Sequence, residues 1–319
     1  MASPPLTIVV PAEVQGQRLD VFLVRTLAQA SRERVRELIA AGGVRVNGHR
    51  RAKGTRVAAG DVLFIEGWDA AGAAAPAANP SLSLSVLYQD AEVLVLDKPA
   101  GMPTHALRSD ERHTLANFLL AQFPELSTVG KDLREPGLVH RLDTDTSGVV
   151  LVARTAVVWG LLREQFTRRQ VHKEYVALVA GEVVHGGEIR TAIAHDRRHR
   201  RRMRVCTSAE QAAALRARPA ITSYRPLQRL PGATLLAVEI ATGVMHQVRV
   251  HLASIGHPLV GDRLYGGPPA ARHMLHASCI AFVHPRTGAR VRVESAPPED
   301  FQVAVASRGG QVRGRLGGG

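Results

Sequence analysis

A stretch rich in alanine, proline and glycine, DAAGAAAPAANPSLS at residues 69–83, most constrains how this chain can fold. It is nearly uncharged and has no amphipathic period, so it predicts a linker rather than a helix or strand. The chain therefore divides into a small unit at 16–68 and a large unit at 84–306, and a length of 319 residues suits two domains. The glycine-rich basic end, 307–319, is expected to be a disordered tail.

The small unit shows the pattern of two helices and a hairpin. Apolar residues at helical spacing predict helices at 18–27 and 31–41, the second with an N-cap at Ser31. Alternating valines then lead into Asn47-Gly48, a pair typical of a tight hairpin turn, and a last strand is expected from Asp61. These signals predict a small α+β domain.

Charge favours a polyanionic partner, because basic groups that bind phosphates release condensed counterions. The net charge is +13, but 37 of the 41 basic residues are arginine, a bias that a GC-rich genome would also produce. The small unit carries few acidic residues to balance its arginines, which favours RNA binding over a merely solvated surface. Its candidate RNA contacts are Arg32, Arg34, Arg36, Arg50 and Arg51.

A second basic cluster is the run DRRHRRRMR at 196–204. A charge run is usually a solvated loop, but in a protein that acts on RNA such a loop would grip phosphates. Arg201 and Arg202 are the candidates here.

Several functional classes find no support in the sequence. No apolar run approaches the roughly 20 residues that span a bilayer, and the N-terminus lacks the basic and apolar regions of a signal peptide. The two cysteines, Cys206 and Cys279, have no CxxC spacing, so we expect neither a disulfide framework nor a zinc site. No glycine-rich phosphate cradle is visible. We therefore expect a cytoplasmic monomer without a cofactor or metal.

The large unit alternates strand and helix signals, and strands predominate. Strands are expected at 86–89, 93–98, 148–155, 173–181 and 233–240, and helices at 114–123, 157–166 and 245–256. Several connections are short enough for hairpins. This pattern predicts an α+β unit built on one large mixed, mostly antiparallel sheet.

The segment VHRLDTDTSGVV at 139–150 holds two carboxylates, Asp143 and Asp145, and three chemistries could use them. A calcium loop that begins at Asp143 would need a glutamate at its twelfth position, where Arg154 would repel the ion. A phosphatase would need a strand directly before the motif and magnesium, with Asp262 as a candidate partner. The strand follows the motif instead, which leaves the phosphatase as a minor alternative.

The third chemistry uses one aspartate. Arg141 precedes Asp143 by two positions, so in an extended strand both side chains would share a face and the arginine would keep the carboxylate ionised. Thr144 and Thr146 can hydrogen-bond a rigid turn, with Asp145 helping to hold it. Asp143 would then be a nucleophile or base. A structural turn with a surface ion pair remains the plain alternative.

Five motifs of the large unit resemble those of a known family. GLVHRLDTDTSGVVLVART resembles the signature of the ribosomal-large-subunit-type, RluA-like pseudouridine synthases. Further motifs follow in order: VLDKPAGMPTH before it, then FTRRQVHKEYVALVAG, TGVMHQVRVHLASIGHPLVGDRLYG and LHASCIAFVHPRTG. The resemblance spans about 84–301 and implies the pseudouridine synthase fold. Residues 17–66 resemble the alpha-L RNA-binding module, which a small-subunit ribosomal protein shares.

The resemblance implies a role for individual residues. Asp143 matches the catalytic aspartate, and Arg249 matches the arginine that pairs with it. Tyr175 matches the tyrosine that stacks on uracil and can accept the proton from ring carbon five. Arg141 matches an arginine that steadies the RNA when the target base is flipped. Pocket positions are expected at Leu275, His246 and Gln247.

One position departs from the family. A basic residue usually follows TG in TG[RK]xHQ[IL]R, and this chain has Val244 there. The change could weaken activity, alter selectivity, or be compensated by a nearby arginine, and restoring an arginine should then be tolerated. Two functions therefore remain: an RNA pseudouridine synthase, or a catalytically retired relative that only binds RNA. Large-subunit ribosomal RNA is the family's commonest substrate for members with this leading module, and transfer RNA is an alternative.

Overall fold

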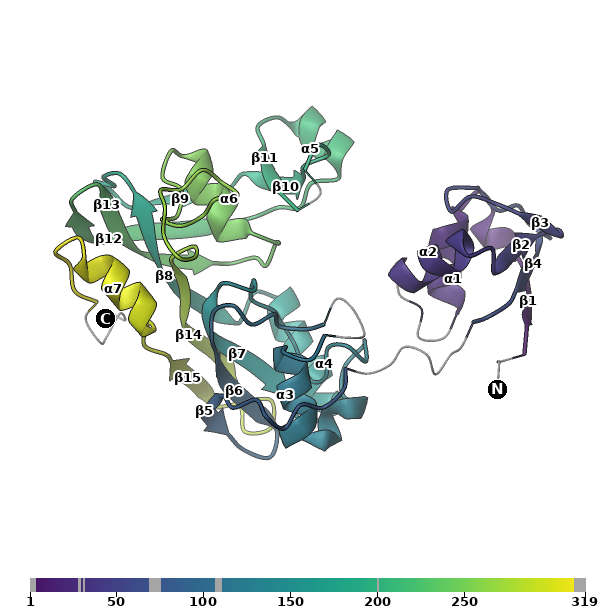
Figure 1. The fold of residues 1–319 in the computed structure, drawn as a ribbon, viewed down its shortest axis with the longest axis horizontal. Coiled ribbons are helices and arrows are strands. Elements are labelled where there is room, and N and C mark those ends of the chain that lie inside the picture. Colours follow the sequence, from purple (N-terminus) through teal and green to yellow (C-terminus); the bar gives the residue numbers. More distant parts are fainter. Residues whose placement is uncertain are drawn as a thin grey trace. The chain divides into compact units, whose positions relative to one another are not determined.

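The computed structural model describes residues 4–27, 30, 32–68, 76–106, 111–199 and 201–312, apart from the side chains at 32 and 33. The chain separates into two compact units near residue 75 (Figure 1). Of the predicted linker, 69–75 lies outside the described residues. Its remainder has no helix or strand, and Asn117 donates a hydrogen bond to the Ala77 carbonyl at 2.7 Å. Of the predicted tail, 313–319 also lies outside.

The small unit packs two helices on a four-stranded sheet, which confirms its predicted α+β character. The helices are α1 (Leu19–Thr26) and α2 (Arg32–Ala40), and the sheet order is β1 (Leu6–Val9), β4 (Val62–Ile65), β2 (Val44–Val46) and β3 (His49–Arg50). Strand β1 pairs antiparallel with β4 and lies ahead of the predicted start at residue 16. Leu19, Leu23, Val35 and Leu63 are fully buried between the layers.

The turns of the small unit follow its glycines. Asn47 and Gly48 have φ of +50° and +81°, which gives the tight β2–β3 hairpin predicted from this pair. Gly42, just after α2, also has a positive φ. This left-handed conformation favours glycine, and the Arg50 guanidinium lies against the position that a Cβ would take.

The large unit is built on one nine-stranded sheet (Figure 1). The order is β5 (Ser85–Gln89), β6 (Val93–Lys98), β7 (Ser147–Ala153), β14 (Leu275–Val283), β8 (His172–Ala180), β13 (Ala233–Ile240), β12 (Thr222–Leu230) and β9 (Gly187–Ile189), with β15 (Arg290–Glu294) also paired to β14. Only the β7–β14 pair is parallel among the described residues. The prediction of a mixed, mostly antiparallel sheet is confirmed.

Short helices flank this sheet. They are α3 (Leu115–Gln122), α4 (Ala156–Thr167), α5 (Ala209–Leu215), α6 (Gln247–Ser254) and α7 (Glu299–Ala306). Thr114 and Asn117 form a reciprocal capping box that starts α3, and Thr155 caps α4. Helix α4 lies beside β7, whereas α6 lies beside β12 (Figure 1). The main hydrophobic core of the large unit is largely aliphatic and includes the fully buried β6 residues Val93–Leu96.

A separate two-stranded hairpin projects beside α6. It consists of β10 (Ala192–His195) and β11 (Met203–Cys206), with α5 packed against it. The predicted basic loop is the tip of this hairpin and the start of β11. The side chain of Arg201 is exposed there and that of Arg202 is half-buried.

Candidate active site

A cavity of about 790 Å³ lies in the large unit and gathers residues from widely separated segments. All seven residues that were predicted to act in catalysis, at the pocket wall or in base flipping line it: Arg141, Asp143, Tyr175, His246, Gln247, Arg249 and Leu275. Such a volume lies in the range of pockets that hold a drug-sized ligand.

The loop of Asp143 is a tight turn that leads into strand β7. The Thr146 backbone N–H donates to the Asp143 carbonyl at 3.0 Å, and β7 begins at the next residue. Gly148 has φ of +114°, and a Cβ at this position would lie 2.1 Å from the Ala277 carbonyl oxygen. Glycine is therefore required where β7 and β14 approach each other. The turn places Asp143 directly before the end of β7 that pairs with β14.

Two buried basic side chains donate hydrogen bonds to the backbone of this turn. Lys98 is fully buried, and its Nζ donates to the carbonyls of Pro99, Met102 and Thr144 at 2.7 to 3.0 Å. Burial lowers the pKa of Lys98 to about 7, although neighbouring carboxylates oppose this shift. Arg272 donates to the Asp145 carbonyl at 3.0 Å. The turn is thus fixed through its backbone carbonyls and not through the Asp143 carboxylate.

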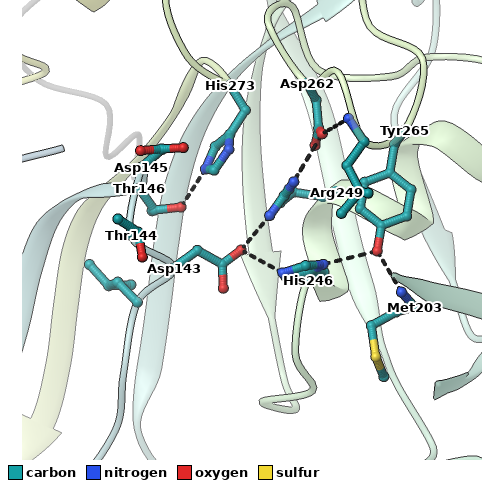
Figure 2. Close-up of polar contacts among 12 residues, drawn as sticks. Asp143, Thr144, Asp145, Thr146, Met203, His246, Arg249, Asp262, Tyr265 and His273 are labelled. Carbon is teal, nitrogen blue, oxygen red and sulfur yellow. Dashed lines mark hydrogen bonds and ion pairs between the residues drawn. The ribbon is translucent and has the colours of Figure 1, made fainter. Parts of the chain in front are cut away.

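Arg249 joins two carboxylates (Figure 2). Its Nη1 lies 3.0 Å from Asp143 Oδ2, and its Nε and Nη2 make a bidentate pair with Asp262 at 2.7 and 2.9 Å. Burial raises the pKa of the Asp143 carboxyl, but His246 and Arg249 outweigh it and hold that pKa below its usual range. Asp143 is therefore ionised at neutral pH.

The ion pair predicted between Arg141 and Asp143 is wrong for the described residues. Both residues lie in the coil before β7, so alternation along a strand does not apply to them. Arg141 instead places Nη1 3.4 Å from Nε2 of His105, and its side chain is exposed. Asp145 is exposed as well, and among the described residues its carboxylate makes no hydrogen bond. Asp145 was predicted to help hold the turn, and it does so through its backbone carbonyl and not through its side chain.

Two histidines flank the carboxylate. His246 Nε2 lies 3.8 Å from Asp143 Oδ2, and its Nδ1 is 3.0 Å from the Tyr265 hydroxyl. His273 Nε2 lies 2.8 Å from Thr146 Oγ1. Burial lowers the pKa of both rings, that of His273 to about 4. Because the imidazoles are then neutral near pH 7, the permanent positive charge beside Asp143 is that of Arg249.

Tyr175 and Leu275 form an apolar wall of the cavity. They come from neighbouring strands, β8 and β14, and only 8% and 4% of their surfaces are exposed. Burial, with a smaller contribution from the Asp143 charge, raises the pKa of Tyr175 well above its usual value. The ring therefore stays a neutral phenol, a flat face on which a base can stack.

Gln247 lines the cavity, but its side-chain amide makes its hydrogen bonds to other residues of the protein. Its Oε1 accepts from Thr242 Oγ1 at 2.8 Å and from the Val244 N–H at 3.1 Å, and its Nε2 donates to the Ile221 carbonyl and Thr222 Oγ1. It is 3% exposed. Gln247 therefore fixes the loop before α6, and its backbone and neighbours shape the cavity.

The sequence reasoning missed four cations on the cavity wall: Arg163, Arg169, Lys173 and Arg218. Lys173 could have been found, because it lies two residues before Tyr175 and shares its face of β8. Asp262, the candidate magnesium partner of the phosphatase alternative, pairs with Arg249 instead. Across the described part of the chain, no group of three or more His, Cys, Asp or Glu side chains could hold a metal ion.

The candidate RNA-binding arginines of the small unit differ in their surroundings. The Arg34 guanidinium lies 4.2 Å from the centroid of a Trp68 ring, so part of it is engaged in a cation–π contact. The Arg32 side chain lies outside the described residues. The exposed ones are Arg36, Arg50 and Arg51.

A paired carboxylate beside an aromatic wall, in a cavity ringed by cations, defines an enzyme that handles a flat base on a polyanion. The sequence profile of the RNA pseudouridylate synthase family matches residues 92–254, and that of the S4 domain matches 17–63. The chain belongs to the RNA pseudouridylate synthase family and carries an S4 domain in front of the synthase unit.

Individual relatives agree with this assignment over nearly the whole chain. The ribosomal large subunit pseudouridine synthase D of Xylella fastidiosa is 37% identical over 93% of this chain and 91% of its own length. That of Pseudomonas aeruginosa is 35% identical over 92% of both chains. The solved structure of human RNA pseudouridylate synthase domain containing 1 is 28% identical, with a TM-score of 0.55, over 68% of this chain and 84% of its own. Along the described residues no helix has the length and apolarity to cross a membrane.

Proposed function

We propose that this chain isomerises specific uridines to pseudouridine in large-subunit ribosomal RNA, with Asp143 as the catalytic residue. The observation that carries the proposal is the ionised Asp143 carboxylate, held by Arg249 in a cavity that Tyr175 also lines. Membership of the family and the names of the full-length relatives support it.

The reaction needs few parts. The bond from ribose carbon one to uracil N1 breaks, a bond from the same carbon to ring carbon five forms, and the proton on carbon five moves to N1. Asp143 can attack the anomeric carbon or remove the 2′ proton, and Arg249 keeps it ionised for either route. The neutral Tyr175 ring and Leu275 would hold the detached uracil while the base rotates. Extracting the base from its stack costs about a few kcal/mol, which contacts to the RNA must offset.

Release of tritium from RNA labelled at uracil carbon five tests this function. Transcripts of large-subunit ribosomal RNA and a pool of transfer RNA should be compared, and pseudouridines should be mapped in a deletion strain. We expect release from the ribosomal transcript and loss of ribosomal pseudouridine in the strain. Release from transfer RNA alone would reassign the substrate, and binding without release would identify a retired RNA-binding relative.

We further propose that the small unit supplies RNA affinity. Its exposed arginines Arg36, Arg50 and Arg51 support this, and their replacement by glutamine should raise the dissociation constant and flatten its salt dependence. Each lost phosphate contact lowers the slope of log K against log salt by roughly 0.7 to 0.9. A matched control neutralises three exposed arginines that are paired with glutamates: Arg168, Arg190 and Arg229. Equal slopes for the two variants would contradict the proposal.

A monomer in the cytoplasm stays a prediction, which sedimentation and fractionation would test.

A further inference from the structure

Tyr265 stands where the basic hairpin meets the active site (Figure 2). Its hydroxyl is 2.9 Å from the Met203 backbone nitrogen at the start of β11 and 3.0 Å from His246 Nδ1. The Arg249 guanidinium carbon lies 5.3 Å from its ring centroid, and that of Arg202 lies 5.4 Å away. One ring therefore touches the arginine of the catalytic pair and an arginine of the hairpin.

One of the two hydrogen bonds of this hydroxyl has a fixed direction. The Met203 N–H can only donate, so the hydroxyl oxygen accepts it and the hydroxyl proton is free to go to His246 Nδ1. Because burial lowers the pKa of His246, the neutral ring then carries its proton on Nε2, which faces Asp143 at 3.8 Å. A Tyr265 hydroxyl that donates to Nδ1 would thus favour the tautomer that presents an N–H to the carboxylate.

The surroundings make this junction stiff. His246 has φ of +56°, an unusual backbone conformation for a residue with a side chain, and it immediately precedes α6. Met203, Val244 and Tyr265 belong to one buried apolar cluster, so the hairpin and the start of α6 pack on each other through shared side chains. A displacement of β11 would therefore reach His246 through both packing and hydrogen bonds.

We propose that Tyr265 is a positioning residue that couples phosphate binding on the β10–β11 hairpin to the geometry around Asp143. Arg201 is exposed at the hairpin tip and would hold the RNA backbone, while Arg202 rests on the Tyr265 ring. RNA bound to the tip fixes β11, and Met203 and Tyr265 then fix the His246 ring and the Arg249 guanidinium beside the carboxylate. The coupling rests on the proposed synthase function, which it extends to a specific use of the hairpin.

A double-mutant cycle tests the coupling. Tyr265→Phe keeps the ring and removes the hydroxyl, and Arg201→Gln with Arg202→Gln removes the charges of the hairpin. Tritium release gives kcat and KM for the wild type, each variant and the combination. Tyr88→Phe is the matched control, because it removes a hydroxyl that bonds Asp90 at 2.7 Å on the edge strand β5. Thermal unfolding and circular dichroism confirm that each variant folds.

We expect Tyr265→Phe to lower kcat about tenfold with KM within about threefold, and Tyr88→Phe to change neither. The hairpin substitutions should raise KM and lower kcat, but in the Tyr265→Phe background they should raise KM only. Losses in kcat that multiply, or an unchanged kcat in Tyr265→Phe, would overturn the coupling.

A second measurement does not depend on activity. In ¹⁵N-histidine NMR spectra, His246 should be the Nε2–H tautomer in the wild type and a mixture of tautomers in Tyr265→Phe. A ring protonated at Nδ1 in the wild type would overturn the proposal whatever the turnover. An inactive wild type with the expected tautomer shift would refute the synthase function, and with it the coupling, while the hydrogen-bonded junction would stand.

Discussion

Asp143→Asn and Asp145→Asn make the same chemical change two positions apart, and the structure predicts opposite outcomes. An asparagine at 143 retains an acceptor for Arg249 Nη1, and Arg249 keeps its bidentate bonds to Asp262. Weakening one charge-assisted hydrogen bond should lower the free energy of unfolding by only about 1 kcal/mol. The reactive carboxylate is gone, however, so the rate should fall by at least about 10⁴-fold.

Asp145 offers the internal comparison. Its side chain is exposed, and the turn holds it through its backbone carbonyl, which Arg272 contacts at 3.0 Å. Asp145→Asn should therefore change the free energy of unfolding by less than about 0.5 kcal/mol. Its rate should stay within about threefold of the wild type.

Tritium release under single-turnover conditions measures both rates, and urea unfolding measures both stabilities. RNA affinity, from a filter-binding titration, should stay within about threefold for each variant, so that lost turnover reports on chemistry. The reaction should also proceed with a chelator present. Turnover by Asp143→Asn, equal loss in both variants, or inhibition by chelator alone would refute the single-carboxylate reasoning and return attention to the paired-aspartate alternative.

Three further predictions concern the cavity wall. Tyr175→Phe should lower kcat by at most about tenfold because the stacking face remains, whereas Tyr175→Ala should lose more than about 100-fold, both by tritium release. Burial lowers the pKa of Lys173 to about 8, so its charge is present below that pH and lost above it. RNA affinity in a titration at constant salt should weaken as the pH rises through about 8, and Lys173→Arg should remove this dependence. The tolerance of an arginine at 244 that the family pattern led us to expect is replaced by a cost: Val244→Arg should lower the free energy of unfolding by about 1–3 kcal/mol in urea, because Val244 is 8% exposed and lies in an apolar cluster.

The elements of the fold were predictable because their signals are local. Capping threonines, the Asn47-Gly48 turn and runs of alternating or helical period each concern residues within one or two turns of the chain. Strand β1 was missed because Leu6–Val9 is a short edge strand whose residues are mostly exposed, so it shows no buried alternation. The prediction of a mixed, mostly antiparallel sheet rested on short connections, and the β7–β14 pair shows that one parallel neighbour can arise through a long crossover.

The site was predictable only in part, because its contacts are long-range. Asp143 and Arg249 are 106 positions apart, and only the family resemblance joined them. The spacing of residues in the sequence predicts neither the ion pair between Asp262 and Arg249 nor the hydrogen bond from Lys98 to the Thr144 carbonyl. Arg141 and Asp143 do not share a strand face, because both lie in the coil before β7. Tertiary packing decided each of these contacts.

Val244 shows how a departure from the family pattern can be accommodated. In this chain the side chain packs with Ile193, Met203 and Tyr265, so an apolar residue completes the contact between the hairpin and the start of α6. A cation still lines the same cavity, because Arg218 is one of its lining residues, and its backbone pairs with that of Ile193. The exposed Arg218 side chain can supply the positive charge that the family pattern places after TG. The Asp143–Arg249 pair and the apolar packing of Val244 therefore argue for a working enzyme and against catalytic decay.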